Sequence, residues 1–222
     1  PTQPALPGVG IDRLFTPRTV EDTLKIREFI EQHHPRSAVL AGGGFIGVEL
    51  MENLRELGID VTVVQRPRQL LNPLDADMAA FLHAKLRQKG VRLHLGCTVE
   101  GFAANGDRVN VLLKDEAPLT ADMVVLAIGV TPDTGLAKAA GLELGIKGSI
   151  LVNDRMETSA PDIYAVGDAV QVKHFVTGQD TLLSLAGPAN KQGRIAADNI
   201  CGGDSRYPGS QGSSVIKVFD MT

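Results

Sequence analysis

The feature that most constrains the fold is residues 38–49, AVLAGGGFIGVE, where a short apolar run meets three glycines. Residues 37–41 have the length and composition of a strand. Apolar residues then recur at helical spacing from Val48 to Leu57, Gly58 ends that helix, and residues 60–65 form a β-branched strand. Strand, glycine turn, helix and strand within about 30 residues make a βαβ unit with parallel strands. The chain is therefore predicted to be an α/β protein.

The glycine turn has the spacing of a phosphate-binding turn. Gly42 permits a tight turn, Gly44 lets a phosphate approach the backbone, and Gly47 allows close packing of helix on strand. Free N–H groups and the helix dipole favour negative charge at such a helix N-terminus. We expect a dinucleotide pyrophosphate here, and the alternative is a glycine-rich turn without a ligand.

The end of the second strand, in VVQRPRQ, is where the ribose of a dinucleotide is read. A site that prefers NAD usually has an acidic residue there, but this chain has Gln65, followed by Arg66 and Arg68. A carboxylate would repel a 2′-phosphate, whereas arginines attract it. The sequence therefore favours acceptance of NADPH, and the alternative is that both arginines are solvated surface charges.

Further elements extend this first unit. Helices are predicted over 20–33 and 75–89, and strands over 91–95 and 122–129. Alternating runs on both sides of Asn105-Gly106 predict an antiparallel hairpin.

The pattern restarts after Gly148. We expect strands over 149–153, 162–168 and 215–219, and a helix over 187–203. The Gly-Asp pair that ends the second of these strands places a carboxylate where it either accepts bonds from ligand hydroxyls or caps a helix.

Composition excludes several classes of protein. The net charge of the 222 residues is -4 without a basic block, so no nucleic-acid partner is expected. No apolar run reaches the ~20 residues of a membrane span, so no membrane association is expected. Cys97 and Cys201 are too few for a disulfide framework, and the histidines have no shared metal spacing, so no metal is predicted. We expect a cytoplasmic protein, processed or cut from a longer chain.

Four motifs in order resemble a known family. They are AGGGFIGVEL (41–50), VVLAIGVTPDT (124–134), SAPDIYAVGDA (159–169) and LAGPANKQGRIAADNI (185–200). Their order is similar to that in FAD-dependent pyridine nucleotide–disulfide oxidoreductases. The last motif looks most like the branch of NADH oxidases, NADH peroxidases and coenzyme A-disulfide reductases. The resemblance covers about Pro4 to Phe219.

The resemblance implies roles for individual residues. Glu49 matches a glutamate near the nicotinamide end, and Phe45 stands where many members have a tyrosine that gates the flavin face. Gly129 matches the turn beside the nicotinamide nucleotide, and Asp168 the aspartate that binds the FAD ribityl chain. The segment 186–189 opens a helix whose N-terminus points at the flavin pyrimidine. The residues expected to bind the cofactors are Gly42, Gly43, Gly44, Phe45, Ile46, Gly47, Glu49, Gln65, Arg66, Ile128, Gly129, Gly167, Asp168, Ala186, Gly187, Pro188 and Ala189.

The implied fold is a Rossmann-like FAD/NAD(P)-binding fold of three layers, β/β/α, with the βαβ unit plus an antiparallel β-meander. Residues 1–35 would be a lead-in segment and a helix from the FAD domain, 36–147 the NAD(P)-binding domain, and 148–222 the returning half of the FAD domain. The N-terminal FAD half, with its redox cysteine, and the C-terminal dimerisation domain are expected outside this chain. No catalytic residue is therefore expected within it, and the full-length protein is expected to be a homodimer.

The implied reaction passes hydride from NAD(P)H to FAD, then to a disulfide, persulfide, peroxide or oxygen acceptor. The chain alone would bind NAD(P)H without turnover. Two alternatives remain open. One is a flavoprotein of the ferredoxin- or rubredoxin-reductase kind without a redox cysteine, and the other is a non-catalytic NAD(P)H-sensing module.

Overall fold

The computed structural model describes residues 5–222, which form two compact units. Unit 1 runs to Val130 and also includes Ile216–Thr222, whereas unit 2 is Thr131–Val215. The change between units thus falls at Val130, ahead of the division after residue 147 that the sequence suggests, and the C-terminal residues return to unit 1. The first four residues of the expected lead-in lie outside the described part.

A parallel sheet with strand order β1-β8-β2-β3-β4 forms the centre of unit 1. Its strands are β1 (Leu14–Phe15), β2 (Ser37–Ala41), β3 (Asp60–Gln65), β4 (Arg92–Leu95) and β8 (Met123–Leu126). Its helices are α1 (Val20–His33), α2 (Phe45–Glu56) and α3 (Ala76–Gln88). The parallel pairing of β2 with β3 around α2 confirms the predicted βαβ unit.

The predicted antiparallel section is a second sheet in unit 1. It consists of β5 (Val99–Asn105), β6 (Arg108–Leu113) and β7 (Leu119–Ala121), paired in chain order. Gly106 at the hairpin turn has φ +59, as the tight turn requires. The antiparallel meander is thereby confirmed.

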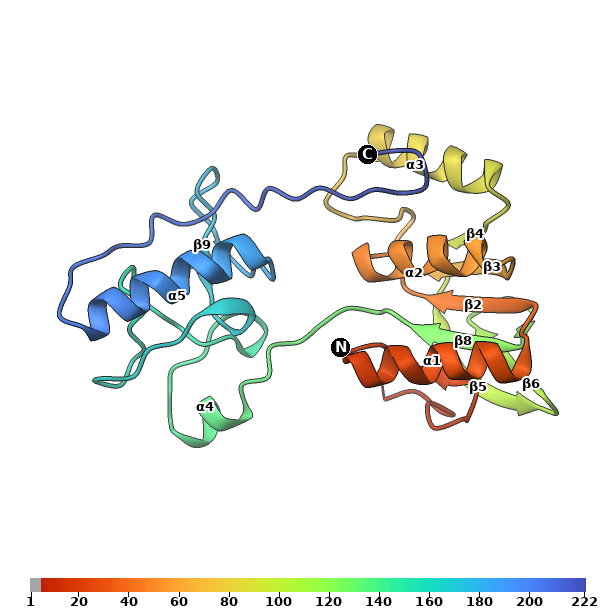
Figure 1. Ribbon diagram of the computed structural model, residues 1–222, viewed down its shortest axis with the longest axis horizontal. Coiled ribbons are helices and arrows are strands. Elements are labelled where there is room, and N and C mark those ends of the chain that lie inside the picture. The colour runs from red at the N-terminus through yellow and green to blue at the C-terminus, as the bar shows by residue number, and fades with distance from the viewer. Residues whose placement is uncertain (1–4) are drawn as a thin grey trace. The chain divides into compact units, whose positions relative to one another are not determined.

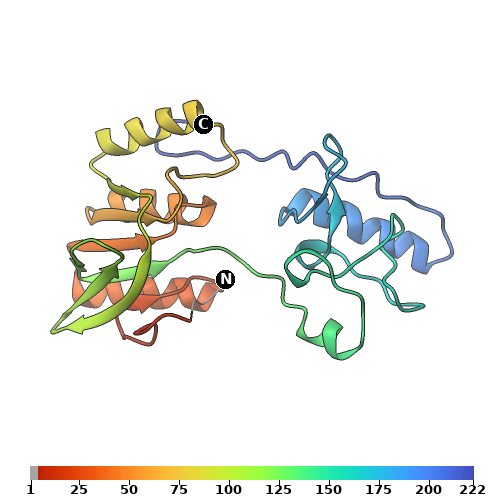
Figure 2. The ribbon, with the colours of Figure 1, turned by 180° about the vertical axis from the view of Figure 1, so that it is seen from behind.

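Alternation along the central strands produces the three layers. Leu40 and Val63 face the helices and pack in one core with Met51 of α2. Their neighbours Val39 and Val64 point to the opposite face and pack in a second core with residues of the antiparallel sheet. Figures 1 and 2 show the helices on one face of the parallel sheet and β5 and β6 on the other. This is the predicted β/β/α arrangement.

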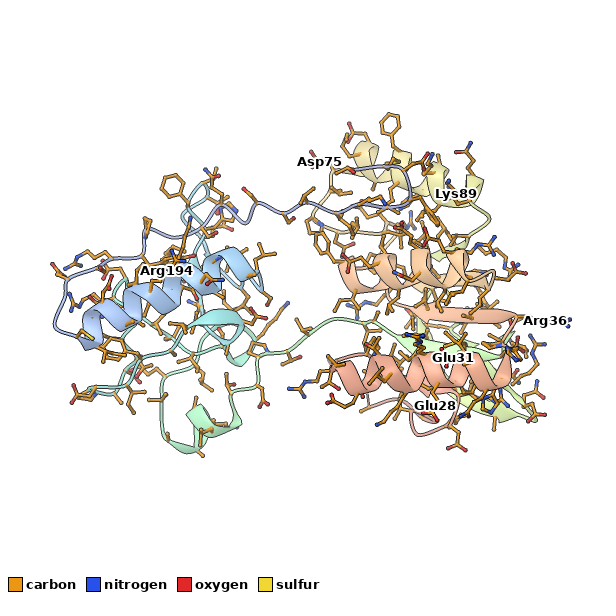
Figure 3. All side chains as sticks on the ribbon, in the orientation of Figure 1. Glu28, Glu31, Arg36, Asp75, Lys89 and Arg194 are labelled. Atoms are coloured by element: carbon orange, nitrogen blue, oxygen red, sulfur yellow. The ribbon has the colours of Figure 1, made fainter. Side chains whose placement is uncertain are left out.

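Local signals explain where the helices start. Thr19 caps α1 in a capping box with Asp22, a pattern visible in the sequence before the helix. Asp75 and Lys89, labelled in Figure 3, flank the two ends of α3. Helix α2 starts at Phe45 rather than at Val48, so the predicted start was wrong. The apolar periodicity begins only at Val48. It misses the first turn of the helix because a phosphate-binding glycine turn leads directly into the helix that follows it.

Unit 2 has less regular structure and its own core. Its elements are α4 (Gly135–Ala139), the 3-10 turns η1 (Ile146–Gly148) and η2 (Gly167–Ala169), the paired strands β9 (Val172–Lys173) and β10 (Asp180–Thr181), and α5 (Ala186–Ile200). Met156, Val170 and Tyr207 are buried together against α5 residue Ala196.

Three predicted strands are wrong. Within 149–153 and 162–168 the chain makes only isolated bridges, Ile150 with Leu144 and Val170, and Tyr164 with Glu157. Both segments are rich in residues that favour strands, but a strand also requires a neighbouring strand to pair with along its length.

The predicted strand 122–129 is present but shorter than expected, because β8 ends at Leu126.

The third wrong strand, 215–219, is instead a segment that packs on unit 1. Val218 is 3% exposed and belongs to the helix-side core. Asp220 contacts Lys85 Nζ at 2.7 Å and Lys89 Nζ at 3.6 Å, and the Lys89 ammonium lies 5.3 Å from the Phe219 ring centroid. These contacts with α3 make the C-terminal segment part of unit 1.

Candidate functional site

A cavity of about 480 Å³ lies within unit 1 at the carboxyl ends of β2, β3 and β8. Open α/β sheets bind ligands at this edge. The predicted site residues that line it are Gly42, Gly43, Gly44, Phe45, Gln65, Arg66, Ile128 and Gly129. The structure therefore brings together residues that are far apart in the sequence.

Gly42 and Gly47 have no room for a side chain, whereas Gly44 does. Gly42 has φ +113, and a Cβ there would lie 2.3 Å from the carbonyl oxygen of Ala127. A Cβ at Gly47 would lie 2.2 Å from the Gly42 carbonyl oxygen. A Cβ at Gly44 would meet no atom within 4 Å, so packing within the protein does not require glycine there. The open space beside Gly44 is the approach that a ligand would use.

The N-terminus of α2 adjoins this space without a protein cap. Gly44 is the N-cap, it makes no side-chain cap bond, and the first turn contains no acidic residue. The N–H groups of Phe45, Ile46 and Gly47 have no partner within their own helix because of their position. The helix dipole adds positive potential at the same end. This end of α2 is suited to an anionic group.

The side chain of Gln65 connects the end of β3 to the glycine turn. Its Oε1 accepts a hydrogen bond from the Gly43 N–H at 2.9 Å, and its Nε2 donates to the Gln69 carbonyl at 3.4 Å. The sequence indicated that Gln65 faces a ribose but gave no signal of the bond to Gly43. Gln65 therefore shapes the turn as well as lining the cavity.

Arg66 is the one charged side chain among the described residues that line the cavity. Within residues 5–222, the guanidinium groups of Arg66 and Arg68 make no hydrogen bond or ion pair, and both residues are exposed. No described carboxylate lines the cavity. The rim near β3 is therefore positive and unoccupied by an internal partner.

Cys97 also lines the cavity, a location that sequence reasoning missed. Cys97 comes shortly after the predicted strand 91–95, and this position alone indicates that it lies at the carboxyl edge of the sheet, where the cavity is. The thiol is 4% exposed, and burial raises its pKa, with the nearby Glu116 carboxylate adding to the rise. A protonated, buried thiol contributes an apolar wall.

The other predicted residues lie elsewhere. Glu49 is exposed on α2 and does not line the cavity. Gly167 and Asp168 form the 3-10 turn η2 of unit 2, where the Gly167 N–H donates to Gln192 Oε1 at 2.7 Å. Asp168 is exposed.

Residues 186–189 form the first turn of α5. This turn has no side-chain cap and contains no acidic residue. Gly187 and Pro188 line a second cavity of about 380 Å³ in unit 2, together with Phe175 and Lys191. Unit 2 therefore contains its own uncapped helix N-terminus beside an open space.

The described residues 5–222 also lack two further kinds of feature. No group of three or more His, Cys, Asp or Glu side chains in this range is arranged to hold a metal ion. None of its helices has the length and apolar character required to cross a bilayer.

Comparison with known proteins relates the chain to characterised enzymes. A model of the pyridine nucleotide-disulphide oxidoreductase family matches residues 1–193. The NAD(P)H sulfur oxidoreductase (CoA-dependent) of Pyrococcus abyssi is 35% identical over the whole chain, which covers 49% of that protein. The chain thus spans about half the length of the curated relatives it matches.

Solved structures show the same likeness. Reduced Bacillus anthracis CoADR-RHD is 48% identical with a TM-score of 0.94, over 99% of this chain and 40% of that one. An engineered NADPH oxidase, derived from the water-forming NADH oxidase of Lactobacillus brevis, is 30% identical with a TM-score of 0.93, over 99% of this chain and 48% of that one. The predicted fold class and the predicted resemblance are both confirmed. The chain belongs to the pyridine nucleotide-disulphide oxidoreductase family.

Proposed function

We propose that the unit 1 cavity binds NAD(P)H and that the chain is the dinucleotide-binding part of a flavoprotein oxidoreductase. The observation that carries this proposal is the open space beside Gly44, against the uncapped N-terminus of α2. Protein packing leaves that space open, whereas a pyrophosphate would fill it and accept hydrogen bonds from the free N–H groups. Membership in the family supports the same ligand.

The lining residues give the bound dinucleotide a direction. Its pyrophosphate lies at Gly44, its adenosine ribose at Gln65 and Arg66, and its nicotinamide toward Phe45 and Gly129. NAD(P)H supplies the hydride when bound. The chain contributes binding and orientation: the glycine turn fixes the phosphates, and the Phe45 ring, 38% exposed, forms an apolar wall.

NADPH is the dinucleotide that the rim favours. The cavity has Gln65 in place of an acid, an unpaired Arg66, and no carboxylate among its described lining. In the engineered NADPH oxidase, an aspartate is replaced by alanine and the next residue, an alanine, by arginine. A glycine of that oxidase is also replaced, and it precedes the aspartate by the spacing that separates Gly47 from Gln65 here. By this spacing, Arg66 corresponds to the arginine introduced in that oxidase.

Unit 2 is proposed to belong to the FAD-binding part of the whole protein. Asp168 is exposed and available to ribityl hydroxyls, and the uncapped start of α5 provides positive potential for the flavin pyrimidine edge. The division at residues 35 and 147, with the redox cysteine upstream, remains part of this proposal. So do a homodimeric whole protein and a cytoplasmic location.

The acceptor is proposed to be a disulfide, persulfide, peroxide or oxygen. Relatives of this chain are named as an NAD(P)H sulfur oxidoreductase, an NADH oxidase and a coenzyme A disulfide reductase. Anaerobic mixing of the full-length protein with NADPH tests the first half-reaction. Loss of the oxidised flavin absorbance is expected, followed by recovery when the true acceptor is added. Flavin that stays oxidised with both NADPH and NADH would exclude the proposed reaction.

The cofactor preference has its own test. We expect Arg66→Ala to lower kcat/KM for NADPH by about tenfold and to leave kcat/KM for NADH nearly unchanged. Arg27→Ala, which removes an exposed ion pair of α1 and does not touch the cavity lining, is the control. A preference for NADH above about tenfold that Arg66→Ala does not alter would refute the NADPH proposal.

A further inference from the structure

The wall of the cavity between β3 and α3 is an irregular segment, residues 66–74. It belongs to no helix or strand, yet it contributes five lining residues. They are Arg66, Pro67, Leu71, Asn72 and Pro73. Because no ladder or helical bond holds this wall, its shape depends on a few specific hydrogen bonds.

One hydrogen bond attaches the wall to the glycine turn. The Leu71 N–H donates to the Gly43 carbonyl at 2.8 Å. Within the wall itself, the Gln69 Nε2 donates to the Leu74 carbonyl at 2.8 Å. Leu71 is 2% exposed and has φ +47, a conformation that a branched side chain adopts only under constraint. The wall is therefore held in a strained shape, and its bond to Gly43 fixes it on the side of the glycine turn.

The anchor on the other side is a histidine of α3. The Leu70 N–H donates to His83 Nε2 at 3.1 Å. Leu70 is fully buried, and its side chain packs over the Gly43 Cα. His83 itself does not line the cavity. It holds the wall from behind.

We propose that His83 is a positioning residue for the dinucleotide site: its neutral imidazole fixes the 66–74 wall through Leu70, and protonation releases the wall and weakens dinucleotide binding. This inference rests on the proposed binding of NAD(P)H in the cavity. A protonated imidazole has two N–H donors and no acceptor, so it faces the Leu70 N–H with a like group.

The surroundings keep His83 neutral near pH 7. Burial lowers its pKa from the ordinary 6.5, and the positive charge of Arg87, one helical turn along α3, lowers it further. One turn back, α3 carries alanines, and residues 69–74 opposite contain no charged side chain. The wall is therefore anchored at neutral pH, and the anchor is lost as the pH falls through this lowered pKa of His83.

The test measures Kd by calorimetric titration of the full-length protein with NADP⁺, which withstands acid better than NADPH. Wild type, His83→Gln and His83→Leu are compared at about pH 7.5 and about pH 5.5. Gln offers an acceptor oxygen near the place of Nε2 but does not titrate, whereas Leu offers none. His33→Gln, an exposed histidine at the end of α1, is the matched control.

The wild type is expected to bind at pH 7.5 and to lose about fivefold more affinity on acidification than His83→Gln, because the 2′-phosphate titrates equally in both. His83→Leu is expected to bind about fivefold more weakly than wild type at pH 7.5. His33→Gln should follow the wild type. An identical pH profile for wild type and His83→Gln overturns the positioning role alone. Absence of wild-type binding to both NADP⁺ and NAD⁺ at pH 7.5 refutes the proposed function, and the inference with it.

Discussion

The Gly43 N–H donates to Gln65 Oε1 at 2.9 Å, across twenty-two positions of the chain. This bond joins the turn after β2 to the end of β3, the two places from which a dinucleotide would be held. It also settles which end of the Gln65 amide is committed to the protein. The amide nitrogen, whose bond to the Gln69 carbonyl is 3.4 Å long, is the end available to a ligand.

Gln65→Glu separates the structural role of this side chain from its electrostatic role. A carboxylate still accepts the Gly43 N–H and loses only the 3.4 Å bond to the Gln69 carbonyl, so the melting temperature is expected to fall only slightly. The new charge repels a 2′-phosphate, so Kd for NADP⁺ should rise about tenfold while Kd for NAD⁺ changes little. Calorimetric titrations with the two dinucleotides measure this difference.

Gln65→Leu is the complementary variant. It leaves the buried Gly43 N–H without a partner and is expected to cost about 1–2 kcal/mol of unfolding free energy. Equal effects of Gln65→Glu on both dinucleotides would argue against a ribose-reading position.

Gly42→Ala is expected to destabilise unit 1 by about 2 kcal/mol or more. The residue has φ +113, and the added Cβ would lie 2.3 Å from the Ala127 carbonyl oxygen. Gly106→Ala is the control, because Gly106 also has positive φ but a Cβ there meets no atom within 4 Å. Urea unfolding should show a loss of only about 1 kcal/mol for the control. Similar losses for both variants would mean that the contact with Ala127 contributes nothing.

Asp122 predicts a pH dependence of stability in unit 1. Burial raises the pKa of this carboxyl, but the N–H groups of Arg36 and Ser37, the Ser37 hydroxyl and the Arg108 charge outweigh burial and lower it below 3.8. A lowered pKa in the folded state adds stability that is present above the ordinary value and is lost as the pH falls through the folded-state value. Asp122→Asn should therefore cost about 2 kcal/mol at pH 7, and less as the pH falls below the ordinary carboxyl value.

Urea unfolding at several pH values measures this effect. Asp107→Asn is the control, because the Asp107 side chain is fully exposed and meets Arg13 only at 3.4 Å. A stability difference between wild type and Asp122→Asn that does not shrink on acidification would contradict the assignment.

The C-terminal segment is predicted to stabilise unit 1. Val218 is 3% exposed within the helix-side core, whereas Val215 is 81% exposed just before the segment. Val218→Ala should cost about 1.5 kcal/mol and Val215→Ala almost nothing. Hydrogen exchange of the β2 amides reports unit 1 directly. Unchanged exchange in Val218→Ala would place the segment outside the cooperative unit.

Local patterns were enough to predict the frame of the site. The apolar spacing after Val48, the cap at Thr19 and the turn at Gly106 each leave a signal within a few residues. Parallel pairing then follows from the βαβ order, which places the ends of β2 and β3 at one edge of the sheet. This reasoning, together with the family resemblance, identified eight of the nineteen residues that line the cavity.

Long-range partners were not predictable in this way. Nothing near Val218 indicates that it returns to the core of unit 1, and nothing near His83 indicates a bond to Leu70. Residues 149–153 have strand-like composition, but composition does not say whether a neighbouring strand is present to pair with them. These features depend on how distant segments meet.

The most direct test of the cavity as a dinucleotide site is the affinity of Gly44→Ser for NADP⁺. Gly44 has the extended backbone of an N-cap, φ −80 and ψ −173, so serine fits without strain and its hydroxyl caps α2. The hydroxyl occupies the N–H groups and the open space that the pyrophosphate requires. We predict a melting temperature equal to or above that of wild type, with a Kd at least about tenfold higher in a calorimetric titration. An unchanged Kd in a folded Gly44→Ser variant would contradict the proposal that the dinucleotide binds at this turn.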